Sequence, residues 1–144
     1  MQESQVLAQR VFDRLLFLRL EVEYKPIGTR IQSDLILRYG ELVGNVLVFL
    51  RKYAAKTLVA RIASNRRFLE GLEATHKRLD YFFSKVNLTM RSEMTEWQKN
   101  WEGDLNLQQL LFESFLANKL VVNAELTERG LEEALTEMKY ELTL

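Results

Sequence analysis

The sequence predicts an all-α protein: an up-down four-helix bundle followed by one or two additional, brace-like C-terminal helices. Proline occurs once in 144 residues, and the β-branched alternation of strands hardly occurs. Apolar side chains follow helical spacing through residues 64–89, and two such stripes run side by side through residues 30–55. These observations favour helices joined by short connections, and the chain length favours one folding unit.

The first helix is expected from about residue 4 to residue 23, with Phe12 and Leu16 widening its apolar stripe. The stripe itself consists of Leu7, Val11, Leu15, Leu18 and Val22. Pro26 and Gly28 predict a turn at residues 25–29, because proline removes the residue before it from the helical region. A second helix is then expected over residues 30–55.

Two adjacent apolar stripes distinguish this second helix. They are Leu35/Tyr39/Leu42/Val46/Phe49/Tyr53 and Ile36/Val43/Leu47/Leu50/Ala54. An arc this wide predicts neighbours on more than one side, and so a central position in the bundle. Gly40 and Gly44 lie four residues apart within it, which predicts close backbone packing against a neighbouring helix.

After a short turn at residues 57–63, the helix at residues 64–89 is expected to begin at Ser64 as its N-cap. Its stripe is Leu69, Leu72, His76, Leu79, Phe83 and Val86. A fourth helix is expected from about Ser92 to Trp101, ending at Gly103. The predicted organisation is a bundle over residues 1–104 and brace-like helices over 105–144, the last with Leu131, Leu135, Met138 and Leu142 on one stripe.

Composition excludes several classes of protein and site. Cysteine is absent, so disulfides, thiolate zinc sites and cysteine nucleophiles are excluded. The N-terminus has no apolar signal-like segment, and no stretch reaches the roughly 18 apolar residues of a membrane span. A cytoplasmic protein is expected, with the periphery of a membrane as the alternative location.

Charge is distributed unequally although the formal net charge is zero. Residues 1–67 hold 12 Lys and Arg against 6 Asp and Glu, whereas residues 68–144 hold 8 against 14. The asymmetry predicts either an anion-facing surface or charge complementarity between early and late helices. Its focus is a run without any acidic residue, containing Arg51, Lys52, Lys56, Arg61, Arg66 and Arg67. These six are the candidate anion-binding or lipid-binding residues.

The only histidine, His76, lies in the middle of an apolar stripe with Asp80 one turn later. The pair could hydrogen-bond, and a carboxylate would favour the charged imidazole. No second histidine or other ligand pattern accompanies them, so a structural residue at the seam between helices is the preferred interpretation. Trp97 and Trp101 are likewise expected to be core residues. No cofactor, metal ion or small-molecule substrate is expected.

With the helices placed, the run FLRKYAAKTLVARIASNRRFLEGLEATHKRLDYFFSKVNL, followed by MTEWQKNWEGD, resembles a known family. It is similar to the N-terminal four-helix bundle of mixed lineage kinase domain-like proteins, which are related to HeLo-type helical signalling domains. The likeness covers about residues 5–104 and rests on helix phasing and aromatics such as Phe49, Tyr53, Phe82 and Trp97. It implies a regulatory bundle that self-associates, is held by a C-terminal brace, and in some members binds acidic phospholipids.

The expected function is therefore a non-catalytic helical signalling module that mediates association between proteins, with acidic phospholipid as a possible ligand of the basic run. No phosphate-binding loop, nucleophile elbow or kinase signature is present, so an enzyme is not expected. One alternative is a nucleic-acid-associated four-helix accessory protein that forms a basic oligomer, which is the less favoured partner class. The other is a plain helical scaffold without anion binding.

Overall fold

The computed structural model describes residues 3–23, 30–86, 91–118, 123–124 and 127–143. In these residues the structure is helical throughout apart from short turns, which confirms the predicted all-α class. The helices are α1 (Gln5–Glu23), α2 (Arg30–Ala54), α3 (Leu58–Ala63), α4 (Asn65–Lys85), α5 (Ser92–Ala117) and α7 (Glu128–Thr143). The turn predicted at residues 25–29 lies outside the described residues.

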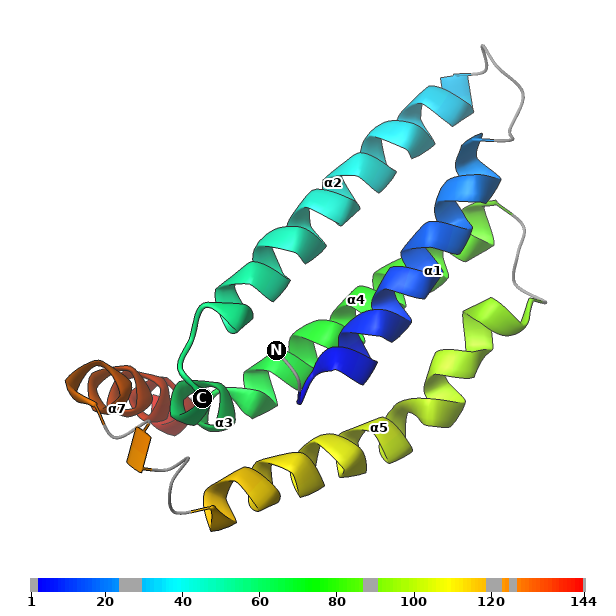
Figure 1. Cartoon of the computed structure of the whole chain (residues 1–144). Coiled ribbons are helices and arrows are strands. Elements are labelled where there is room, and N and C mark those ends of the chain that lie inside the picture. Colours follow the sequence, from blue (N-terminus) through cyan, green and yellow to red (C-terminus); the bar gives the residue numbers. More distant parts are fainter. Residues whose placement is uncertain (1–2, 24–29, 87–90, 119–122, 125–126, 144) are drawn as a thin grey trace.

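Four long helices form the bundle, and each runs opposite to the one before it (Figure 1). Helix α1 packs against α2, α4 and α5, and α4 packs against α1, α2 and α5. Helices α1 and α4 therefore form the middle of the bundle, and α2 and α5 form its outer edges (Figure 1). The short α3 turns the chain between α2 and α4.

The predicted stripe of α4 forms the centre of the core. Leu72, His76, Leu79 and Phe83 are buried, and Val86, which follows the helix, is buried as well. Ser64 precedes α4 at the N-cap position, as predicted, but its hydroxyl donates a hydrogen bond back to the Ala60 carbonyl at 2.9 Å. The hydroxyl therefore closes α3 instead of capping α4.

The prediction that the second helix is central is wrong, because α2 lies at an edge. Its first stripe packs into the core, while Ile36, Val43 and Leu47 of the second stripe are exposed. The close packing predicted at Gly40 and Gly44 is also absent among the described residues, where a Cβ at either position meets no atom within 4 Å. The spacing correctly located a second apolar face, but none of the described helices covers it.

The predicted helix end at Gly103 is wrong as well. Helix α5 continues through this residue to Ala117, so the predicted boundary between residues 104 and 105 falls inside a helix. A helical glycine costs about 1 kcal/mol relative to alanine. The contacts of the next turns outweigh this cost, since Asp104 is paired with Arg10 and Phe112 is buried.

Helix α7 packs on α3 at the end of the bundle where α2 ends and α4 begins (Figure 1). This position places the acidic end of the chain beside the basic run. Among the described residues, no helix is long and apolar enough to cross a membrane.

Candidate functional site

The six cations of the basic run are gathered at the end of the bundle that α7 covers, but they differ in their partners. Arg51 and Lys52 lie in the last turn of α2 and are exposed. Lys56, Arg66 and Arg67 form ion pairs with α7, and Arg61 forms one with the N-terminal segment. Four of the six predicted anion-binding residues therefore contact carboxylates of the same chain.

Helix α7 supplies its carboxylates from one face. Glu137 and Glu141 are one turn apart and so project together. Lys56 Nζ lies 2.8 Å from Glu137, and Arg67 contacts the same carboxylate. Glu141 accepts hydrogen bonds from the Nε atoms of Arg67 at 2.8 Å and Arg66 at 2.9 Å. The hydrogen bond from Arg67 is the main reason that the pKa of Glu141 is lowered.

A third carboxylate on this face, Glu133, accepts a hydrogen bond from the Thr57 backbone N–H at 3.0 Å. This bond, together with Arg129, lowers the pKa of Glu133. The carboxylate thus holds the start of α3, where the Thr57 hydroxyl also accepts from the Ala60 N–H at 3.3 Å. The three carboxylates of α7 therefore join this helix to the bundle end through ion pairs and a hydrogen bond.

Arg61 is bound on its other side. Its Nε lies 2.5 Å from the buried Glu3 carboxylate, and its Nη1 donates to the Lys56 carbonyl at 2.7 Å. The sequence left two interpretations of the charge asymmetry: an anion-facing surface, or complementary charges within the chain. The ion pairs of these four cations favour the second. Binding of an external anion or lipid by the six cations stays a prediction.

The predicted seam residues form a second cluster, which lies in the interior. The rings of His76 and Trp97 are stacked, with centroids 4.5 Å apart and planes 2° from parallel. Trp101 contacts both rings edge-on. The Trp97 Nε1–H donates to the Asp80 carboxylate at 3.1 Å, so Asp80 joins α4 to α5.

Arg14 of α1 occupies the centre of this cluster. It donates to His76 Nδ1 from Nη1 at 2.8 Å and forms an ion pair with Asp80. The His76 ring therefore bonds to Arg14 and not to Asp80, the partner expected from the sequence. Because a guanidinium can only donate, Nδ1 is the acceptor and the imidazole proton lies on Nε2.

The electrostatic effect on His76 is opposite to the one expected from a neighbouring carboxylate. Burial is the main cause that lowers the pKa of His76 to about 3, and the positive charges of Arg14 and Arg10 lower it further. Burial also lowers the pKa of Arg14, which Asp80 partly offsets. The imidazole is therefore neutral at physiological pH and serves as a structural hydrogen-bond acceptor.

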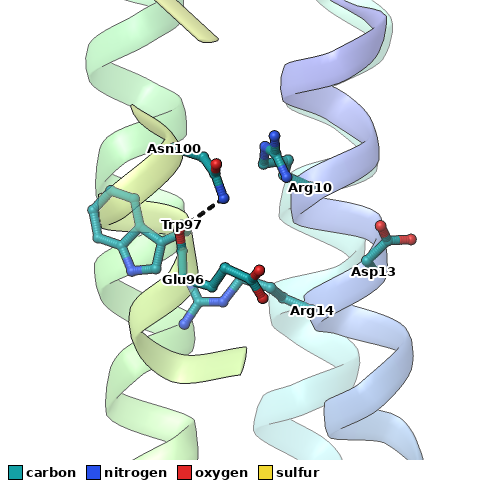
Figure 2. A pocket seen from close by; sticks show the side chains of 6 residues that line it. All are labelled: Arg10, Asp13, Arg14, Glu96, Trp97 and Asn100. Atoms are coloured by element: carbon teal, nitrogen blue, oxygen red, sulfur yellow. Dashed lines mark hydrogen bonds between the residues drawn. The ribbon is translucent and has the colours of Figure 1, made fainter. Parts of the chain in front are cut away.

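A small cleft of about 120 Å³ opens beside this cluster between α1 and α5 (Figure 2). Arg10 at its edge pairs with Asp104 at 2.6 Å, and Asp13 accepts from Gln9 at 2.8 Å. Asn100 donates to the Glu96 carbonyl at 3.1 Å (Figure 2). Each of these polar side chains already has a partner, and the described residues contain no group of acidic or histidine side chains that could hold a metal ion.

A third feature is the exposed apolar surface on α1 and α2, which we call the α1–α2 face. Each of its six large apolar side chains is between 36% and 55% exposed. They are Phe12, Leu16, Leu20, Ile36, Val43 and Leu47. A groove of about 400 Å³ runs along this face and is lined by Phe12, Leu16, Tyr39, Gly40 and Val43, among others.

Arg14 and the carboxylates of α7 are missing from the residues singled out in the sequence. A signal for Arg14 exists, because it lies three residues after Val11 and four before Leu18, on the buried side of α1. Glu133, Glu137 and Glu141 are spaced by four, which marks one acidic face. The spacing reveals the face, whereas its partner is set by how α7 docks.

Comparison of the chain with protein-family models, with curated proteins and with solved structures found no match. The resemblance to mixed lineage kinase domain-like bundles therefore stays a prediction.

Proposed function

We propose that the chain is a non-catalytic helical association module that binds a second copy of itself through the α1–α2 face. The observation that carries this proposal is the uncovered second stripe of α2, which the sequence presents as a packing surface and which no described helix of the chain covers. Contiguous exposed apolar side chains on two adjacent helices are typical of protein–protein interfaces.

The shape of the α1–α2 face favours a second copy of the chain as its binding partner. Phe12, Leu16 and Leu20 project from α1, whereas α2 carries Gly40 and Gly44, beside which a Cβ would meet nothing within 4 Å. In a twofold arrangement the same patch serves on both copies, so the large side chains of one α1 can lie over the glycines of the other α2. A glycine allows another backbone to approach closely.

Sedimentation velocity over a concentration series tests the proposal. The wild-type protein should associate, and Leu16→Glu combined with Val43→Glu should abolish association through this face while leaving the far-UV circular dichroism unchanged. Leu110→Glu is the matched control, because Leu110 is an exposed apolar residue on α5. A wild-type protein that stays monomeric at high concentration would refute the proposal, as would a double variant with unaltered mass.

Acidic phospholipid binding is the second candidate, favoured by Arg51 and Lys52. Both are exposed, and neither pairs with a carboxylate in the described part of the chain. Near an anionic surface each such cation is worth about 1 kcal/mol. Co-sedimentation with phosphatidylcholine vesicles, with and without phosphatidylserine, should show weak binding that Arg51→Glu with Lys52→Glu removes. Equal sedimentation with both vesicle types would exclude this role.

A further inference from the structure

Helix α7 has two dissimilar faces, and the apolar one is turned away from the bundle. The side that meets α3 carries Gly130 and Ala134 together with the carboxylates already described. Tyr140 lies against Arg67 of α4, whereas four large aliphatic side chains lie on other sides of the helix, where they are between 47% and 87% exposed. They are Leu131, Leu135, Met138 and Leu142.

This exposed row, which we call the α7 stripe, has the spacing of a helix–helix seam. Its members follow one another at steps of four, three and four, which is the alternation of a and d positions in a coiled coil. The ion pairs of Glu137 and Glu141 hold α7 on the bundle end, so the stripe is presented by an anchored helix. Four apolar residues in one row are more than the scattered exposure that is normal on a surface.

The charge of α7 argues for a protein partner over a membrane. The helix carries five glutamates against Arg129 and Lys139, so its net charge is negative. Helices that lie on anionic membranes carry Lys and Arg on their polar face. A partner helix that offers an apolar seam and complementary charges fits this helix better.

The charges beside the stripe select a second copy in antiparallel orientation. In such a pair Leu131 lies opposite Leu142 of the other copy, and Leu135 opposite Met138. Glu132 and Lys139 occupy equivalent positions on one side of the stripe. In the antiparallel pair, Glu132 of one copy therefore faces Lys139 of the other copy, and the twofold symmetry forms this ion pair twice. Both residues are exposed, and neither has an ion pair among the described residues.

A parallel pair lacks this complementarity. Parallel coiled coils place each of these positions beside the position five residues earlier on the other helix. Glu132 would then face Thr127, and Lys139 would face Ala134, and neither contact joins opposite charges. We propose that α7 pairs antiparallel with α7 of a second copy through the α7 stripe, an interface separate from the α1–α2 face.

A charge-reversal cycle on the full chain tests this pairing. The Leu16→Glu/Val43→Glu background removes the α1–α2 face, so any remaining dimer must use another surface. In that background Glu132→Lys and Lys139→Glu should each weaken dimerisation about tenfold, since each replaces two attractive contacts with repulsive ones. The combined reversal should return the dissociation constant to within about threefold of its starting value.

Leu135→Glu in the same background should give a monomer with unchanged helicity, because Leu135 is exposed in the single chain. A monomeric background protein would overturn the pairing, and so would single reversals without effect or a double reversal that fails to restore dimers. The proposed function is judged separately, by whether Leu16→Glu with Val43→Glu reduces the mass of the wild-type assembly.

Discussion

His76 looks like a functional residue in the sequence and is a buried structural acceptor in the fold. The i, i+4 spacing correctly brings Asp80 to the same side of α4, yet the carboxylate bonds to Arg14 and Trp97. Arg14 is 62 residues away in the sequence, so local spacing cannot identify it as the partner of His76. The position of His76 in the core is predictable from its own stripe, but its protonation state depends on residues from other helices.

The depressed pKa of His76 predicts a loss of stability in acid. The folded pKa is about 3 and the ordinary value is 6.5. Between these values the unfolded chain binds a proton that the folded chain excludes, so the free energy of unfolding falls as the pH falls, by up to about 1.4 kcal/mol per pH unit. At pH values above 6.5 this contribution is complete.

His76→Gln should reduce this acid sensitivity, because the glutamine oxygen can accept from Arg14 but does not titrate. Urea denaturation of both proteins between pH 7 and pH 4 gives the measurement. The difference in unfolding free energy between wild type and variant should shift in favour of the variant as the pH falls. A difference that is constant with pH would show that His76 is not held neutral in the fold.

At the scale of single helices, the glycines of α2 and α4 have opposite roles. A Cβ on Gly71 would lie 2.5 Å from the Phe49 ring, which is itself stacked on Phe68. Nothing lies within 4 Å of a Cβ on Gly40. The sequence points to Gly40 and Gly44 as sites of close packing because of their spacing, but the close contact is made at Gly71.

Gly40→Ala and Gly71→Ala should therefore change stability in opposite directions. Alanine at Gly40 should raise the unfolding free energy of the monomer by about 0.5–1 kcal/mol through helix propensity. At Gly71 the same gain is outweighed by overpacking of about 1–3 kcal/mol against Phe49. Urea denaturation at concentrations where the protein is monomeric measures both effects.

Sedimentation velocity of the Gly40→Ala variant measures a second property, its association. If a helix of another copy, either α1 or α2, packs closely over this glycine, the Gly40→Ala substitution should weaken association. The same substitution should still stabilise the single chain. Unchanged association in a stabilised variant would place the contact elsewhere on the α1–α2 face. The two measurements thus separate the packing within one chain from the packing between chains.

The ion pairs of α7 predict that its docking depends on charge, and Arg67 pairs with both Glu137 and Glu141. Arg67→Glu sets a third carboxylate against Glu137 and Glu141, so α7 should separate from α3 more often. Hydrogen exchange of the α7 amides should accelerate by about tenfold, equivalent to about 1.4 kcal/mol of lost docking free energy. Adding Glu137→Arg should recover part of the protection.

Lys77→Glu is the matched control for this experiment. Lys77 pairs with Glu73 within α4 and is largely exposed, so its reversal breaks an ion pair that joins no other helix. Exchange in α7 should then remain at the wild-type rate. Equal protection of α7 in the Arg67 and Lys77 variants would mean that other contacts between α7 and α3 hold the helix.

At the scale of the whole molecule, the helix count explains both uncovered apolar surfaces. A bundle with α1 and α4 in the middle leaves one side of α2 bare, and α7 uses its acidic face to dock. Apolar periodicity in the sequence locates both stripes correctly. It cannot show whether a stripe is covered by the same chain, since that depends on where every other helix packs.

Two separate self-complementary surfaces predict an assembly larger than a dimer. Each twofold contact joins two copies, so both together produce either a closed tetramer or a growing chain. Disabling the α1–α2 face or the α7 stripe alone should leave dimers, and disabling both should leave monomers. Light scattering coupled to size-exclusion chromatography distinguishes these masses, and an unchanged mass in both single-surface variants would contradict the two-surface arrangement.

Salt should separate the two contacts in the unmodified protein. At 1 M ionic strength the Debye length is about 3 Å, so the Glu132–Lys139 pairs and the ion pairs that anchor α7 are largely screened. The α1–α2 face is apolar and does not depend on such pairs, and an excluded salt such as sulfate strengthens apolar contacts. At high salt the α7 contact should therefore weaken, because it loses its ion pairs and keeps only its apolar stripe, and the association that does not weaken should disappear with Leu16→Glu and Val43→Glu. Complete dissociation at high salt would instead show that charged contacts hold every copy together.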